Sequence, residues 1–248
     1  MKITGLTTKQ NVTYLFQGTM NPLAEELFTI YQGAGWLEAT GYGHLVITGP
    51  DAAAWLQRLV SNEVVKRPVG EGCYASLLDR KGQVLSWFYL LRRGDEWFHL
   101  ISPPPLAGKT EQLFRKYKVI ERVQLQNQSA EWGLIRVLGK QANQTVAGIF
   151  DPALIEDRFT PLSGGGFWKE GIYQEPVWNI LVPHQHDTEI KKALGPLKKI
   201  SAEAFEIFRQ KSGVPAYGVD VDEQHTLLEA NMHYAYQRFK GCYPGQEV

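Results

Sequence analysis

The sequence predicts an α+β protein whose α/β layers are built from one unit used twice. Short β-rich runs alternate with segments of helical periodicity, and the order of these elements repeats once along the chain. The length of 248 residues suits one large domain or two modest ones. Each copy has the order β-α-β-β-α-β, the split βαβ or ferredoxin-like arrangement. We therefore expect helices on at least one face of each sheet.

A helix is expected before the first copy. Asn21 is a suitable N-cap, Pro22 suits the first helical position, and Gly33 and Gly35 close the segment. The apolar residues between them share one face: Leu23, Leu27, Ile30 and Tyr31.

The first copy begins at His44. Asp51 caps its first helix, in which Trp55 and Leu56 face the core, and Phe114 faces inward from its second helix. The turn 79–82 joins two of its strands. The strands are expected at 44–48, 74–78, 83–91, 97–101 and 119–125.

The second copy begins at Trp132, and the register of its short strands is less well defined. Its strands are expected at 133–138, 154–159, 166–168, 177–182 and 197–200, and its helices at 140–149 and 188–194. A helix capped by Ser201 follows and ends at Gly213, and residues 227–239 are predicted to be helical as well. This divides the chain into an N-terminal segment, 1–35, and two subdomains, 36–126 and 127–248.

Composition narrows the classes of function. The 26 basic and 26 acidic residues give no net charge, so we expect no nucleic-acid partner, although transfer RNA is left open.

Residues 1–10 lack the apolar stretch of a signal peptide, and no run of apolar residues is long enough to cross a membrane. We expect a cytoplasmic protein with no membrane association. The two cysteines, Cys73 and Cys242, form no disulfide framework and cannot alone hold an iron–sulfur cluster.

The end of the chain carries the most chemically suggestive run, residues 240–247. Gly241 and Gly245 permit sharp turns. Lys240 close to Cys242 would favour the reactive thiolate. The rest of the loop adds an aromatic ring and polar groups: Tyr243, Gln246 and Glu247. From spacing alone, a lone cysteine is more often a small core residue.

This run, K-G-C-Y-P-G-Q-E, resembles the K-G-C-[FY]-x-G-Q-E motif of the folate-binding iron–sulfur cluster assembly factors, which are related to the T-protein of the glycine cleavage system. Three weaker matches support the resemblance: the turn at 47–52, the turn at 81–84, and the run from Arg209 through 213–215 to 228–231. Together they cover about residue 36 to the end.

The resemblance implies two interwoven subdomains around a central cavity that binds tetrahydrofolate or a derivative. It also implies a C-terminal β-barrel domain that this chain lacks. The expected function is a tetrahydrofolate-binding factor for assembly or repair of iron–sulfur enzymes, with iron–sulfur client or assembly proteins as partners. In this reading Cys242 and Lys240 form the reactive site.

Two alternatives stay open: a folate-dependent aminomethyl or one-carbon transferase, and a non-catalytic folate-binding module. The T-protein carries a folate-orienting Asp on the strand after the 81–82 turn, where this chain has Ser86 and Trp87. Ser86 cannot supply the missing charge. The resemblance therefore leaves it uncertain whether the chain is an enzyme.

The expected folate contacts are also carried over from the resemblance: Arg209, Glu175, Asn179, Glu229 and Trp87. For Arg209, a position on a helix surface is an equally good interpretation. Trp87, Trp168 or Trp178 would suit stacking on a pterin, but core packing is the more common role. His225, Glu229 and His233 at helical spacing, and the two histidines of 183–187, are weak metal patterns, so no metal site is predicted.

Overall fold

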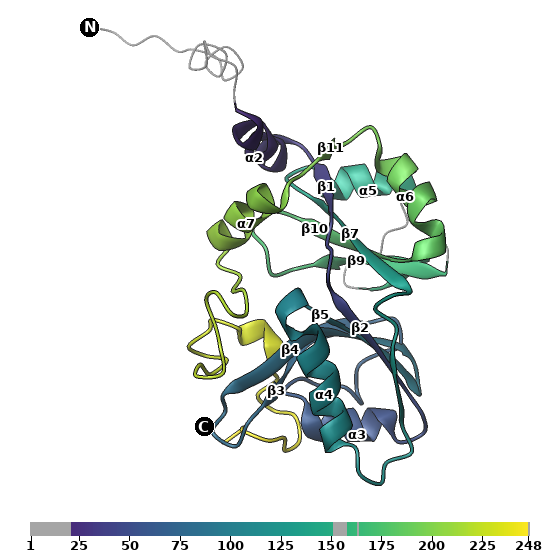
Figure 1. The fold of residues 1–248 in the computed structure, drawn as a ribbon, viewed down its shortest axis with the longest axis vertical. Coiled ribbons are helices and arrows are strands. Elements are labelled where there is room, and N and C mark those ends of the chain that lie inside the picture. Colours follow the sequence, from purple (N-terminus) through teal and green to yellow (C-terminus); the bar gives the residue numbers. More distant parts are fainter. Residues whose placement is uncertain (1–20, 151–157, 163, 248) are drawn as a thin grey trace, which may run out of the picture.

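Two β-sheets lie one above the other along the length of the molecule, each with helices packed on it (Figure 1). The computed structural model describes residues 21–150, 158–162 and 164–247. The predicted first helix is α2 (Pro22–Gln32), and the Asn21 side chain accepts a hydrogen bond from the Ala24 N–H at 2.8 Å. The predicted cap is therefore confirmed.

The first sheet is antiparallel and has the strand order β3-β4-β5-β2-β6. Its strands are β2 (Gly43–Thr48), β3 (Gly72–Leu78), β4 (Val84–Gly94), β5 (Trp97–Ser102) and β6 (Gln124–Asn127), and its helices are α3 (Ala52–Leu59) and α4 (Ala107–Tyr117), the latter preceded by the 3-10 turn η1 (Pro104–Leu106). The last strand begins five residues later than predicted. The Glu121 carboxylate accepts from the N–H groups of Val119 and Ile120, which bends the backbone there.

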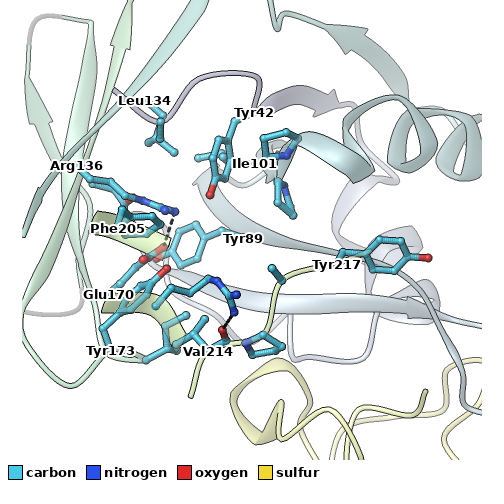
Figure 2. A pocket seen from close by; sticks show the side chains of 18 of the residues that line it. Tyr42, Tyr89, Ile101, Leu134, Arg136, Glu170, Tyr173, Phe205, Val214 and Tyr217 are labelled. Atoms are coloured by element: carbon cyan, nitrogen blue, oxygen red, sulfur yellow. Dashed lines mark hydrogen bonds and ion pairs between the residues drawn. The ribbon is translucent and has the colours of Figure 1, made fainter. Parts of the chain in front are cut away.

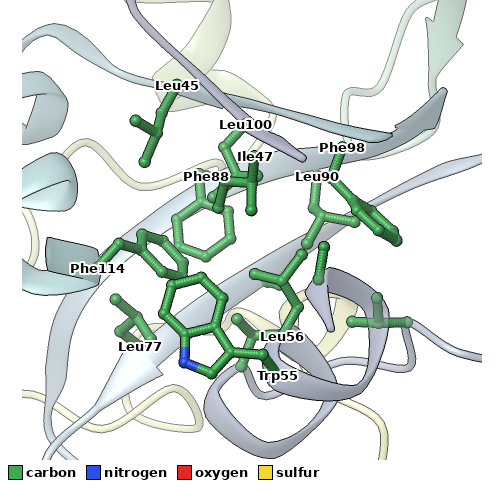
Figure 3. Packing of buried hydrophobic residues seen from close by; sticks show 14 of the residues in the cluster. Leu45, Ile47, Trp55, Leu56, Leu77, Phe88, Leu90, Phe98, Leu100 and Phe114 are labelled. Atoms are coloured by element: carbon green, nitrogen blue, oxygen red, sulfur yellow. The ribbon is translucent and has the colours of Figure 1, made fainter. Parts of the chain in front are cut away.

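The two helices bury their apolar faces on one side of this sheet (Figure 3). Trp55 of α3 packs against Phe114 of α4 with ring centroids 5.7 Å apart, and Phe114 packs against Phe88 of β4 at 5.4 Å. All three rings are almost fully buried, and each contributes roughly 1.5–3 kcal/mol of hydrophobic stabilisation. The opposite face of the sheet is thus turned toward the second sheet and the C-terminal segment.

The second sheet has the order β11-β1-β7-β10-β9-β8. Its strands are β1 (Gly35–Glu38), β7 (Trp132–Leu138), β8 (Thr160–Leu162), β9 (Gly165–Glu170), β10 (Val177–Pro183) and β11 (Lys198–Lys199), and its helices are α5 (Ala142–Phe150) and α6 (Asp187–Leu194), the latter preceded by η2 (His184–His186). The predicted strand at 154–159 falls mostly outside the described residues. Each unit carries three strands between its two helices. The predicted strand ranges also number three there, whereas the order β-α-β-β-α-β has only two.

The two units exchange chain segments. β1, which the prediction divided between the N-terminal segment and the first subdomain, pairs antiparallel with β7 and parallel with β11 of the second sheet. In the second sheet β7 lies between β10 and β1, as β2 lies between β5 and β6 in the first sheet. β1 is therefore the counterpart of β6. The chain then crosses through residues 39–42 into β2. This crossing is the interwoven arrangement that the resemblance implied.

The C-terminal segment crosses in the opposite direction. After α7 (Ala202–Lys211), capped by Ser201, residues 213–247 pack on the open face of the first sheet (Figure 1). The predicted helix at 227–239 is wrong, because only the short η3 (His233–Ala235) forms there. Glu229 accepts hydrogen bonds from the Thr226 N–H and hydroxyl, and Asn231 adopts a left-handed φ of 55°. These local side-chain bonds compete with the helical pattern.

Candidate functional site

A cavity of about 360 Å³ opens between the two sheets, within the range of small-molecule sites (Figure 2). The crossing segment, with Tyr42, forms one wall, and Pro103 to Pro105 lie beside it. The first sheet contributes Trp87 and Tyr89, and α7 with the loop after it forms the remaining side. The second sheet contributes Leu134, Arg136, Trp168, Glu170 and Asn179.

A buried polar network forms the second-sheet wall. Arg136, on β7, donates from Nε to Asn179 Oδ1 on β10 at 3.0 Å, and its Nη2 lies 3.9 Å from Glu170 Oε1 on β9. The Tyr74 hydroxyl, from β3 of the other sheet, donates to the same Glu170 oxygen. The Arg136 guanidinium also lies 5.1 Å from the ring centroids of Tyr42 and Phe205. The charges are thus held in place by residues on four strands, three from the second sheet and one from the first.

Two polar atoms of this network form no hydrogen bond with any of the described residues. Glu170 Oε2 and Asn179 Nδ2 are buried without a hydrogen bond, although both residues line the cavity. A buried donor or acceptor without a partner costs roughly 1–3 kcal/mol. A ligand that offers one donor and one acceptor at this wall would remove that cost.

Aromatic side chains also line the cavity, beside aliphatic residues and prolines. Tyr89 stacks on Trp168 with centroids 4.9 Å apart and an interplanar angle of 14°. Burial, and then the charge of Glu170, raises the pKa values of Tyr74 and Tyr234, so both carry neutral hydroxyl groups at pH 7. The cavity therefore combines flat apolar faces with few fixed charges, which suits a flat heteroaromatic ligand.

Trp87, one of the predicted cofactor contacts, lines the cavity. It lies edge to face with Tyr217, with centroids 5.6 Å apart. Ser86 points the other way: it is fully buried and its hydroxyl bonds Thr110 Oγ1 at 2.6 Å. An indole therefore stands on this strand where the T-protein resemblance places a carboxylate.

The other predicted folate contacts separate into two groups. Asn179 and Arg209 line the cavity, whereas Glu175 and Glu229 are not among its lining residues. Glu175 lies close enough to Tyr31 to raise its pKa, secondary to the effect of burial. Glu229 caps the Thr226 turn described above. Of the three tryptophans considered, Trp87 and Trp168 line the cavity, and Trp178 is buried in the core of the second unit.

Most donors of Arg209 are already used. It bonds Glu206 through Nε and Nη2, and its Nη1 donates to Val214 O and, at 2.7 Å, to Asp220 Oδ2. These bonds lower the pKa of the Glu206 carboxyl to about 2. Four of the five guanidinium N–H groups are thereby engaged. Arg209 fixes the loop that covers the cavity and has little left to offer a ligand.

The 240–247 loop lies outside this cavity. Cys242 and Glu247 are exposed, and the loop is held against the β3–β4 turn at Gly245. Gly245 has a φ of 77°, and a side chain there would approach Asp79 O to 2.4 Å. Tyr243, Gly245 and Gln246 line a separate surface pocket of about 470 Å³. Gly241 has open space around it.

Lys240 has a different setting from the one expected. Its Nζ donates to Gln57 O at 2.7 Å and to Val60 O, at the C-terminal end of α3, where cations are favoured. Burial lowers its pKa to about 8, an effect that the Glu63 carboxylate and then Cys73 oppose, and Cys242 is not among the groups that act on it. Burial raises the pKa of Cys73 to about 11, so that thiol is unreactive.

Sequence reasoning missed Arg136 and Glu170, the two central charges of the cavity. Arg136 is a lone charge inside the apolar run Leu134 to Leu138, and Glu170 ends a strand of buried residues. A charge in a strand that is otherwise buried is the signal that would have indicated them.

Two further features concern other classes of site. Within residues 21–150, 158–162 and 164–247, no three His, Cys, Asp or Glu side chains converge as metal ligands. Since residues 227–239 are not a continuous helix, the predicted face of His225, Glu229 and His233 does not form. No helix in the same ranges is long and apolar enough to cross a membrane.

Comparison with known proteins agrees with this architecture. The chain is 23% identical over 234 residues to an aminomethyltransferase from Thermoanaerobacter sp. (strain X514), covering 88% of this chain and 63% of that protein. An aminomethyltransferase from Prosthecochloris aestuarii is 24% identical over 249 residues, covering 94% of this chain and 69% of its own length.

Among solved structures, glycine cleavage system aminomethyltransferase T from Bartonella henselae superposes with a TM-score of 0.82 at 18% identity, covering 91% of this chain and 64% of that one. This likeness establishes a shared fold. The chain thus spans about two thirds of the length of these proteins. Residues 8–162, more than half of the chain, match the family model of the GCVT N-terminal domain. The chain therefore belongs to the GCVT N-terminal domain family and is related to the glycine cleavage T-protein.

Proposed function

We propose that the cavity between the sheets binds a reduced folate, tetrahydrofolate or a derivative, and that the chain works in folate-dependent one-carbon transfer of the aminomethyltransferase type. The observation that carries this is the pair of unpartnered atoms, Glu170 Oε2 and Asn179 Nδ2, at the wall of an aromatic cavity. The relationship to proteins named aminomethyltransferase supports the class of reaction.

The chemistry of a pterin suits this wall. Its amino group and ring N–H are donors for the Glu170 carboxylate, and its carbonyl oxygen is an acceptor for the Asn179 amide. A bond between a carboxylate and a donor is stronger than a neutral pair and gives orientation as well as affinity. The stacked rings of Tyr89 and Trp168 supply flat apolar surface beside these groups.

Trp87 stands where the T-protein resemblance places a folate-orienting Asp, and this limits which residue can exchange a proton with the substrate. An indole N–H is a donor only and cannot exchange a proton with the substrate. Glu170 is the carboxylate at this wall that could orient the folate or accept a proton. Arg136, held beside it by Asn179, keeps the carboxylate in place and balances its charge.

The test is calorimetric titration of 5-formyltetrahydrofolate into the wild type and two isosteric variants. Glu170→Gln should weaken binding by about tenfold or more, because a charge-assisted bond is lost. Glu175→Gln is the matched control, since Glu175 does not line the cavity, and should bind as the wild type does. Equal affinities for all three proteins would contradict the assignment. Aminomethyl-transfer turnover by the purified chain then tests the reaction class.

A second candidate function is a folate-binding factor for iron–sulfur enzymes. The observation that favours it is the exposed thiol of Cys242 on a loop that Lys240 and Gly245 fix to the first unit. Gln246 and Glu247 add polar groups to the same loop. In this case Cys242 acts on a partner protein, outside the folate cavity.

One experiment distinguishes the two candidate functions. Cys242→Ala, expressed in a cell without its own copy, should fail to restore iron–sulfur enzyme activity if the thiol acts on a client. Full restoration would rule out that role. A protein that binds folate, supports no turnover and needs no thiol would be the non-catalytic module.

A further inference from the structure

A second cavity, of about 300 Å³, lies on the other side of the crossing segment. The two cavities share Glu38, Ala39, Thr40, Tyr42 and Leu134 as a partition. An apolar cavity of about 150 Å³ holds one benzene, so this space suffices for a small organic molecule. Its walls include Trp132 and Ala107. The polar side chains that line it are those of Glu38, Thr40, Tyr42, His44, Ser129, His184, Asp187 and Lys191.

His44, one of a pair of buried histidines, lines this cavity. His44 is 2% exposed and His99 is fully buried, and His44 Nδ1 lies 3.2 Å from His99 Nε2. Since that contact uses Nδ1 of His44, its Nε2 is the nitrogen that remains for a ligand. Burial, with a smaller contribution from His184, lowers the pKa of His44 to about 4. The ring is therefore neutral at pH 7 and does not repel a cation.

The Nε2 of His44 accepts a hydrogen bond in the tautomer that carries the hydrogen of His44 on Nδ1. In that tautomer His44 Nδ1 donates to His99 Nε2, and the hydrogen of His99 is on Nδ1. His99 Nδ1 is buried without a hydrogen bond among the described residues, and the His99 ring lies edge to face with Trp132 at 5.3 Å. A ligand that donates a hydrogen bond to His44 Nε2 selects this tautomer.

Asp187 brings negative charge to the same cavity. Its Oδ2 lies 2.9 Å from His184 Nδ1 and 3.5 Å from Lys191 Nζ, while its Oδ1 is buried without a hydrogen bond among the described residues. Lys191 is closer to Glu38, at 2.7 Å, and Glu38 has Lys199 as a second partner at 2.7 Å. Glu38 thus has two close lysine partners, whereas Asp187 has one longer contact with the shared Lys191. Gly133 leaves room there, because a side chain would come within 3.1 Å of Asp187 Oδ1.

We propose that this second cavity binds a small organic ammonium ion with an apolar body, for which Asp187 is the counter-ion and His44 Nε2 a hydrogen-bond acceptor. The apolar body would lie against Trp132, Tyr42 and Leu134. The proposal concerns a site other than the folate cavity and does not depend on folate binding.

The test compares three probes of similar shape: benzylammonium, benzyl alcohol and benzoate. Calorimetry should give benzylammonium the highest affinity, about tenfold or more above benzyl alcohol, since only the cation gains from the Asp187 charge. The imidazole nitrogen signals of His44 and His99 should shift on binding, while those of His225 and His233 stay in place. Equal affinity for the alcohol, preference for benzoate, or unmoved His44 signals would each overturn the proposal.

Two matched variants on α6 test whether Asp187 supplies the negative charge that binds the cation. Asp187→Asn should reduce the affinity for benzylammonium by about tenfold and leave that for benzyl alcohol unchanged. Glu189→Gln removes the same charge from a side chain that is 73% exposed and should change neither affinity by more than about twofold. Equal losses in the two variants would mean a general electrostatic effect and would refute the site. Thermal melting checks that both variants fold.

Discussion

Lys240 Nζ donates a hydrogen bond to the Gln57 carbonyl oxygen at 2.7 Å. This bond joins a residue two positions before Cys242 to the last turn of α3, which lies 183 positions earlier in the sequence. The ammonium lies 4.9 Å from the Tyr243 ring centroid, so one side chain holds the loop from both sides of the cysteine. The lysine of the motif acts here on the position of the loop.

Replacing Lys240 with Met should lower the free energy of unfolding by about 1–3 kcal/mol, because the end of α3 loses a charged donor. Urea unfolding followed by tryptophan fluorescence measures this. Lys192→Met, at an exposed position on α6, is the control and should have little effect. A loss no larger than that of the control would show that the anchor is not important for stability.

Gly245→Ala tests how the same loop is held against the β3–β4 turn. The new side chain would sit 2.4 Å from Asp79 O and 2.9 Å from Gly82 Cα, at a φ of 77°. We expect a loss of about 1–3 kcal/mol from backbone strain and displacement. Gly241→Ala meets no atom within 4 Å and should be almost neutral. Equal stability of the two variants would contradict the packing described for the loop.

Local signals predicted the elements that depend on local physics. The caps at Asn21 and Ser201 and the apolar face of α2 were visible in the sequence, and they form as expected. The insertion of β1 into the second sheet was not visible, because it depends on a partner strand about a hundred residues away. The predicted helix at 227–239 failed because Thr226 and Glu229 bond to each other and to the backbone.

The candidate site was predicted in part. Asn179 and Trp87 were carried over from the resemblance and line the cavity, whereas Glu175 was chosen in place of Glu170. Short polar runs between strands have no periodicity to fix which carboxylate faces a cavity. Arg136 has no motif around it, and only its burial beside Asn179 and Glu170 in the folded protein gives it a role.

The His44–His99 pair should make the protein sensitive to acid. The pKa of His44 is lowered from 6.5 to about 4 by burial and by His184, and that of His99 is lowered by burial and by the neighbouring His44 and Arg93. The unfolded chain therefore binds more protons than the folded one in this range. Stability from His44 is complete above pH 6.5 and decreases as the pH falls, by about 3 kcal/mol at pH 4.

His44→Gln should show a shallower decrease in unfolding free energy between pH 6.5 and pH 4 than the wild type. His225→Gln removes a partly exposed histidine and should keep the wild-type slope. Denaturant titrations across this pH range give both curves. Parallel curves for the wild type and His44→Gln would show that the buried ring does not titrate as described.

The bonds of Arg209 distinguish a positioning role from a direct folate contact. Arg209→Met should cost about 2 kcal/mol, because Asp220 and the Val214 carbonyl lose their partner. It should also weaken folate binding, since the loop from Val214 to Tyr217 lines the cavity. Asp220→Ala removes the acceptor of the same connection from a residue that does not line the cavity. If Arg209 acts by holding the loop, Asp220→Ala should reproduce much of the loss in folate affinity. Normal folate binding by Asp220→Ala, beside a large loss in Arg209→Met, would instead indicate that the guanidinium contacts the folate itself.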